Sequence, residues 1–158
     1  MTVLRDETAR IRRATSHDAE QIAALVAEHA EYERGEARPE PQALAQALQG
    51  SPARIVAWIV EQAGEPLGYA AVTEDFSTWR ARPFLHLDCL FVRAQYRGRG
   101  IGADLFREAQ RHAREQGLVT LEWQTPHWNG DAIRFYERMG GRYAVKARFT
   151  LDGLELEL

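Results

Sequence analysis

A glycine-rich run between two apolar segments is the feature that most restricts how this chain can fold. Residues 91–106 read FVRAQYRGRGIGADLF, in which Gly98, Gly100 and Gly102 occupy every second position and two arginines accompany them. The segment before them, Phe84–Val92, is apolar on both faces and predicts a buried central strand. The segment after them has apolar residues at helical spacing. The glycines therefore form the turn that joins a buried strand to an amphipathic helix.

This turn has the properties of an anion site. The first N–H groups of a helix have no partner in the helix and carry about half a positive charge. Glycines allow the backbone to approach a ligand closely, and Arg97 and Arg99 add positive charge. We therefore expect a phosphate or pyrophosphate cradle, the alternative being a structural turn with solvated arginines. No Gly-Lys-Ser/Thr follows, and the spacing is not G-x-G-x-x-G, which excludes two familiar phosphate loops.

The hydrophobic pattern of the whole chain predicts a mixed α/β fold. The element order is β-α-α-β-β-β-α-β-α-β-β, with a largely antiparallel central sheet, helices on both faces and one strand–helix–strand crossover. The first helix follows Asp18, and His29 falls on the same face as its apolar residues. Asn129 can cap the last helix, and residues 142–158 predict a strand–turn–strand tail. The length predicts a single domain over residues 1–158.

Composition excludes several classes of function. The net charge is −3 and no wide basic patch occurs, so neither nucleic acid nor a membrane surface is expected as a partner. The single cysteine, Cys89, excludes an intramolecular disulfide and a zinc site built from cysteines, and no metal is expected. The N-terminal residues contain no apolar run of signal-peptide length, which predicts a cytoplasmic protein.

Two motifs resemble those of the GNAT acetyltransferases. Residues 97–102, R-G-R-G-I-G, match the Gln/Arg-x-x-Gly-x-Gly/Ala signature of that family, and residues 127–142, HWNGDAIRFYERMGGR, are similar to its second motif. The segments LDCLFVRAQYRGRGIG, WNGDAIRFYERMGG and AEYER are most similar to the diamine branch, the spermidine/spermine and thialysine enzymes. That branch places two adjacent acidic residues before LFV, where this chain has Asp88 followed by Cys89.

The resemblance implies acetyl-CoA as cofactor. It implies that the end of the buried strand pairs with the pantetheine arm as if the arm were a strand, and that the glycine turn holds the pyrophosphate. The residues that it assigns to the cofactor are Leu90, Phe91, Val92, Arg97, Gly98, Arg99, Gly100, Ile101, Gly102, Ala103, Asn129, Ala132 and Tyr136.

The resemblance also implies direct attack of an amine on the thioester. An alkylammonium of pKa ~10 is about one part in a thousand neutral at pH 7, so the site must remove a proton. We expect Tyr136 to protonate the leaving thiolate. We expect Asp88 to bind the amine or accept its proton, because Asp88 alternates with Leu90 and Val92 on one strand face. Further substrate-binding candidates are Glu33, Glu122 and Trp128. The alternatives are a core aromatic for Tyr136 and a carboxylate satisfied by backbone or arginine for Asp88. For Glu33 and Glu122 the alternative is a charge on the surface, and for Trp128 it is a residue that stabilises the strand–helix turn.

The sequence thus predicts an N-acetyltransferase that moves an acetyl group from acetyl-CoA to a primary amine of a small molecule, either a polyamine or diamine or a thialysine-like compound. An aminoglycoside, an amino acid or a protein N-terminus stays open as acceptor, and so does a non-catalytic acyl-CoA-binding regulatory module. The resemblance implies a homodimer.

Overall fold

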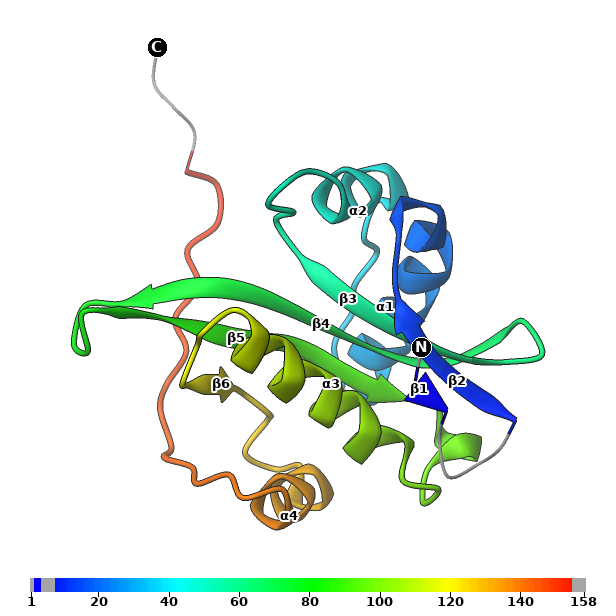
Figure 1. Ribbon diagram of the computed structural model, residues 1–158. Helices are drawn as coiled ribbons and strands as arrows, with labels where there is room; N and C mark the ends of the chain where they lie inside the picture. Colours follow the sequence, from blue (N-terminus) through cyan, green and yellow to red (C-terminus); the bar gives the residue numbers. More distant parts are fainter. Residues whose placement is uncertain (1, 4–7, 155–158) are drawn as a thin grey trace. The chain divides into compact units, whose positions relative to one another are not determined.

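A six-stranded sheet with the order β1-β2-β3-β4-β5-β6 organises most of the chain in this computed structural model (Figure 1). The strands from β1 to β5 are antiparallel neighbours, whereas β6 runs parallel to β5. This confirms the largely antiparallel sheet with one crossover. The strands are β1 (Thr2–Val3), β2 (Ala9–Arg13), β3 (Val56–Gln62), β4 (Glu65–Ser77), β5 (Arg82–Val92) and β6 (Leu121–Trp123).

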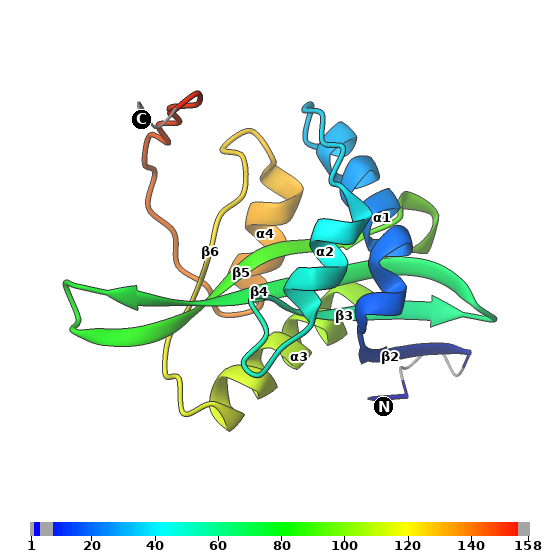
Figure 2. The same ribbon diagram turned by 90° about the horizontal axis from the view of Figure 1, so that it is seen from above.

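Helices cover both faces of this sheet, as the hydrophobic pattern predicts. The α-helices are α1 (Ala19–Tyr32), α2 (Pro41–Leu48), α3 (Ile101–Glu115) and α4 (Gly130–Arg138), and short 3₁₀ turns occur at Ser16–Asp18 and Ala94–Tyr96. Helices α1 and α2 lie on one face and α3 on the other (Figures 1 and 2). The amphipathic patterns of the sequence therefore locate all four helices.

The structure describes residues 2–3 and 8–154. They divide into two compact units, Met1–Gln124 and Thr125–Leu158, which are described separately below. The first unit contains the sheet and α1 to α3, and the second contains α4. The single domain predicted for residues 1–158 stays a prediction.

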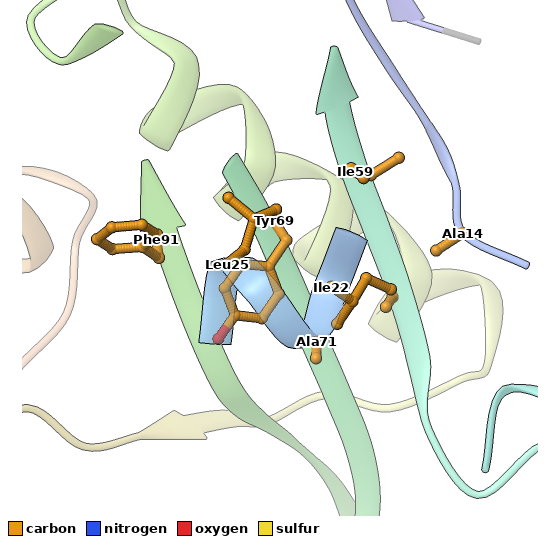
Figure 3. Close-up of a cluster of buried hydrophobic side chains, with 8 residues drawn as sticks. Ala14, Ile22, Leu25, Ile59, Tyr69, Ala71 and Phe91 are labelled. Atoms are coloured by element: carbon orange, nitrogen blue, oxygen red, sulfur yellow. The ribbon is translucent and has the colours of Figure 1, made fainter. Parts of the chain in front are cut away.

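The core under α1 places three strands against one helix. Ile22 and Leu25 of α1 pack with Ile59 of β3, Tyr69 of β4 and Phe91 of β5, all of them nearly inaccessible to solvent. Figure 3 shows Tyr69 and Phe91 projecting from neighbouring strands. Burying a side chain of this size contributes roughly 1.5–3 kcal/mol each. This cluster fixes α1 against β4 and the end of β5.

The strands β4 and β5 approach closely because one pair of facing residues includes a glycine. Gly68 lies opposite Val92, and a Cβ atom built on Gly68 would be 2.4 Å from the backbone oxygen of Phe91. Real Cβ atoms do not come so close to a carbonyl oxygen. Gly68 therefore keeps the end of β5 in register with β4.

The tail differs from its prediction. Residues 141–154 form neither helix nor strand, and residues 155–158 lie outside the described part of the chain. The apolar residues Tyr143, Val145 and Phe149 are exposed, so the alternating pattern of the tail finds no sheet edge in the described unit. An isolated two-stranded hairpin is marginal in water, which is the physical reason that the pattern alone does not produce it. The two-residue strand β1 was not predicted either.

Candidate active site

The end of β5 has one open edge. Strand β6 pairs with β5 only from Leu85 to Leu87, so in the described first unit no strand lies beside the following residues on that side. The backbone N–H of Arg93 points to β4, where it donates to the oxygen of Leu67 at 2.8 Å. Because backbone groups alternate between the two sides of a strand, those of Leu90 and Val92 point to the open edge.

The glycine turn lies directly after this edge. Gly98 and Gly100 have φ angles of +77° and +82°, a left-handed backbone that favours glycine, and open space surrounds both positions. The first helical hydrogen bond of α3 runs from Asp104 N to Gly100 O at 3.0 Å. The three N–H groups before it belong to the first turn, where a helix offers no carbonyl partner. An anion such as a pyrophosphate therefore fits this turn.

Arg97 is engaged inside the protein. Its Nε donates to the backbone oxygen of Val92 at 2.7 Å, and its guanidinium carbon lies 4.3 Å from the ring centre of Tyr32 and 5.5 Å from that of Phe91. The sequence interpretation placed this side chain beside the phosphates. These contacts connect the glycine turn to the end of β5 and to α1, and a role of Arg97 at the phosphates stays a prediction. The guanidinium carbon of Arg99 lies 5.5 Å from the ring centre of Tyr96.

Asp88 occupies a β-bulge in β5. In the register between β4 and β5, Ala71 faces Cys89 and Val72 faces Leu87, so Asp88 has no residue opposite it. A bulge bends its strand and changes the direction of the side chains on either side. Asp88 is thus the extra residue at the point where β6 ceases to pair.

The bulge corrects the predicted orientation of Asp88. Simple alternation would place its carboxylate on the face of Leu90 and Val92. Instead its Oδ2 lies 3.7 Å from Sγ of Cys89, which packs against the core under α1, and its Oδ1 lies 3.7 Å from Nε2 of His86. Asp88 therefore lies on the α1 side of the sheet. Its side chain keeps 60% of its surface exposed, so a ligand can reach the carboxylate.

A chain of polar contacts connects Glu33, directly after the last turn of α1, with Asp88 on β5. The Nε2 atom of His29 lies 3.2 Å from Oε1 of Glu33, and its Nδ1 lies 3.1 Å from the hydroxyl of Tyr69. The Tyr69 hydroxyl and the Cys89 thiol interact with each other, and the thiol in turn contacts Asp88. We call these five residues the carboxylate bridge. The structure thus joins two of the predicted substrate-binding residues.

Burial keeps the three central groups of the carboxylate bridge uncharged. Desolvation lowers the pKa of His29, against the opposing effect of Glu33 and Asp88. Desolvation raises the pKa of Tyr69 above its usual range and that of Cys89 to about 12. Imidazole, phenol and thiol are therefore neutral near pH 7, and they lie between the two carboxyl groups of the bridge.

Sequence reasoning did not identify three members of the bridge as functional. His29 was recognised only as a residue on the apolar face of its helix, and Cys89 only as a small hydrophobic residue. A polar side chain on a buried face is itself a signal, because such a group requires a partner. The partner of His29 is Tyr69, 40 positions further along the chain, so that contact becomes visible only in the folded protein.

Glu122 is paired within the protein. Its Oε1 lies 2.6 Å from a guanidinium nitrogen of Arg80, near the end of the hairpin formed by β4 and β5. The assignment of Glu122 to substrate binding stays a prediction. Among the described residues, no group of three or more histidine, cysteine or acidic side chains is arranged to hold a metal ion. No helix of the described chain is long and apolar enough to cross a membrane.

The remaining predicted site residues belong to the second unit. The side chain of Asn129 accepts a 3.2 Å hydrogen bond from the backbone N–H of Ala132 and caps α4, as predicted. The ring of Tyr136 meets that of Phe135 edge to face at 5.1 Å, and Trp128 is partly exposed. The cap explains why Asn129 is buried. The assignments of these four predicted residues to acetyl-CoA or substrate stay predictions.

The sheet with its open edge and the glycine turn define an acyl-CoA-dependent transferase fold, and the family comparison agrees. The model of the acetyltransferase (GNAT) family matches residues 21–141, so the chain belongs to this family. It is an acyltransferase whose acetyl donor is acetyl-CoA.

Two curated relatives carry the name thialysine N-epsilon-acetyltransferase. The protein from Caenorhabditis elegans is 31% identical over 88% of this chain and 89% of its own length. The protein from Bos taurus is 30% identical over 87% of this chain and 86% of its own length. They agree with the resemblance to the diamine branch.

Solved structures of low identity share the fold. An aminoglycoside acetyltransferase from an uncultured soil metagenomic sample, in complex with trehalose, superposes with a TM-score of 0.77 at 18% identity, covering 93% of this chain and 99% of that one. The ribosomal-protein-alanine N-acetyltransferase from Brucella melitensis gives 0.69 at 20% identity, covering 92% and 99%. These likenesses confirm the GNAT fold.

Proposed function

We propose that this acetyltransferase transfers the acetyl group of acetyl-CoA to a primary amine of a small molecule, a diamine, a polyamine or a thialysine-like compound. The observation that carries the proposal is the position of Asp88 on its bulge. The carboxylate is exposed at the point where β5 becomes open, and the carboxylate bridge links it to Glu33. Two carboxylates on one side of an open strand edge suit a cationic acceptor. The two thialysine relatives support the same acceptor class.

The open edge and the glycine turn would hold the cofactor. The backbone groups of Leu90 and Val92 would pair with the pantetheine arm, and the N–H groups of residues 98–103 would receive the pyrophosphate. When bound, acetyl-CoA supplies an activated acetyl thioester. The task of the residues around this edge is then to orient that group toward an amine near Asp88.

Asp88 would remove the proton that prevents attack. Deprotonating an alkylammonium at pH 7 costs about 4 kcal/mol, since its pKa of ~10 lies three units above the ambient pH. An accepting carboxylate near the amine offsets part of this cost, and positioned acids or bases typically contribute about 10²–10⁴-fold in rate. Glu33 would attract a cationic acceptor to the same side, and Tyr136 would return a proton to the departing thiolate.

The acceptor class is tested by measuring thiol release from acetyl-CoA with amines that differ in one feature. We expect 1,4-diaminobutane, spermidine and thialysine to react with a higher kcat/KM than butylamine, which has no second charge. An aminoglycoside, an unmodified amino acid and a peptide with a free N-terminus serve as comparison acceptors. Preference for one of these three would overturn the proposed acceptor. The homodimer and the cytoplasmic location stay predictions from the sequence.

A further inference from the structure

The carboxylate bridge has fewer hydrogens available for hydrogen bonding than it has contacts between polar groups. Four contacts join its five groups, from Glu33 through His29, Tyr69 and Cys89 to Asp88. A neutral imidazole, a phenol and a thiol each donate one hydrogen, and ionised carboxylates only accept. Three hydrogens cannot fill four contacts. With both carboxylates ionised, one contact of the bridge is therefore always between two acceptors.

One added proton supplies the hydrogen that is missing from the contact between two acceptors. If Asp88 carries it, its O–H donates to the Cys89 sulfur, the thiol to the Tyr69 oxygen, and the phenol to Nδ1 of His29. The remaining hydrogen of the imidazole, on Nε2, then donates to Glu33. Every contact then contains one hydrogen, and each group donates to the next in the direction from Asp88 to Glu33. Such chains polarise their members and are strengthened as a unit, more so in a buried environment.

We propose that His29, Tyr69 and Cys89 are positioning residues that join Glu33 and Asp88 into one proton-accepting unit for the acceptor amine. The inference rests on the proposed function and deepens it. In this step an N–H bond of the ammonium breaks, its electron pair stays on nitrogen for attack, and an O–H bond forms on Asp88. Transfer to the amine releases one proton overall, and it leaves to solvent from the exposed Asp88 carboxyl group.

The charges around the imidazole decide where the added proton resides. The groups that face His29 are Glu33 on its own helix, Tyr69 on β4, Asp88 and Cys89 on β5, and Arg97 in the loop after β5. The positive charge of Arg97 disfavours a second positive charge on the imidazole, as does burial. His29 therefore orders the bridge in its neutral form, and the carboxylate end takes the proton.

A pair of substitutions at one position tests the bridge in the free protein, independently of acetyl transfer. Serine in Cys89→Ser keeps a group that both donates and accepts, whereas alanine in Cys89→Ala removes it. By NMR we expect Cys89→Ala to move the titration midpoint of the His29 imidazole by about 0.5 pH unit, although Tyr69 separates the two side chains. Cys89→Ser should remain close to the original protein. An unchanged His29 midpoint in Cys89→Ala would overturn the proposal.

Kinetics of the same variants supply a second readout. Tyr69→Phe and Cys89→Ala should each lower kcat/KM for the amine roughly fivefold to tenfold and move the acidic limb of its pH profile. Because both substitutions interrupt the same carboxylate bridge, kcat/KM of the double variant should be no lower than that of the worse single variant. Losses that multiply would contradict a shared bridge. His112→Gln is the matched control, since it removes a partly buried histidine that packs on Trp58 on the other side of the sheet.

The experiments distinguish a wrong function from a wrong carboxylate bridge. If the original protein transfers acetyl groups to none of the amines, the proposed function is wrong, and the NMR titration still decides whether the bridge exists. If transfer occurs and the His29 midpoint ignores Cys89→Ala, the bridge is wrong and the function stands.

Discussion

The Nε atom of Arg97 donates a 2.7 Å hydrogen bond to the carbonyl oxygen of Val92, five residues earlier. That carbonyl belongs to the open edge of β5, so one side chain ties the glycine turn to the strand end where the pantetheine arm is proposed to pair. The stacking of the same guanidinium on Tyr32 extends the link to α1.

Replacing Arg97 should therefore weaken cofactor binding. In Arg97→Met the hydrogen bond and the stacking contact are lost, and we expect the Kd for CoA in calorimetry to rise about fivefold, the equivalent of ~1 kcal/mol. Arg107→Met is the control, because it removes one positive charge from the exposed side of α3, where Arg107 pairs with Asp104. Equal losses in the two variants would show that Arg97 acts only through net charge.

Gly100 and Gly117 lie at opposite ends of α3 and allow a matched test of the cradle. Both have a left-handed backbone, with φ of +82° and +72°, and no atom within 4 Å of a built Cβ. Alanine at either position should cost about 1 kcal/mol of unfolding free energy. Only Gly100→Ala should also raise the Kd for CoA by about tenfold or more, because its Cβ enters the proposed pyrophosphate cradle. Similar CoA affinities for the two variants would make Gly100 purely structural.

Gly68 should tolerate no side chain at all. Alanine there would place Cβ 2.4 Å from the Phe91 oxygen, and backbone must move to relieve the clash. We expect Gly68→Ala to lower the free energy of unfolding by about 1–3 kcal/mol in denaturant titrations. Gly64→Ala, in the turn between β3 and β4 where nothing lies near the built Cβ, should cost about 1 kcal/mol from its φ of +81° alone. A smaller effect at Gly68 than at Gly64 would be inconsistent with the close approach of β4 and β5.

His29 should make stability depend on pH. Burial lowers its pKa in the folded protein, whereas in the unfolded chain it titrates near its ordinary value of ~6.5. Below that value the unfolded state binds more protons, so the free energy of unfolding falls as pH falls. For one such group the slope reaches at most about 1.4 kcal/mol per pH unit. His29→Gln should make the free energy of unfolding, measured by chemical denaturation, fall less steeply between pH 7 and pH 5. The part of the decline that comes from His112, whose pKa is also lowered by burial, should remain. An unchanged slope would mean that His29 is not neutral in the folded protein.

Much of the fold was predictable because it depends on local patterns. The helix after the glycine turn and the cap at Asn129 appear where helical spacing and capping residues predict them. The tail was predicted wrongly as a hairpin, since strands require a partner and residues 141–154 have none in their unit.

The site was predictable in its parts but not in its connections. The glycine turn and the candidates Glu33 and Asp88 follow from residue types and resemblance. The bulge arises from the pairing of β5 with Ala71 and Val72, which no local pattern of β5 reveals. It turns Asp88 toward Cys89 and Tyr69 and thereby creates the carboxylate bridge.

An amine bound beside Asp88 should receive the acetyl group of acetyl-CoA. The most direct measurement follows two products together, the free thiol of CoA and the acetylated amine identified by mass spectrometry, with 1,4-diaminobutane or thialysine as acceptor. We expect both products to form in equal amounts and Asp88→Asn to lower their common rate by about 10²-fold or more. Binding of CoA with no amine-dependent formation of either product, or an unchanged rate in Asp88→Asn, would contradict it.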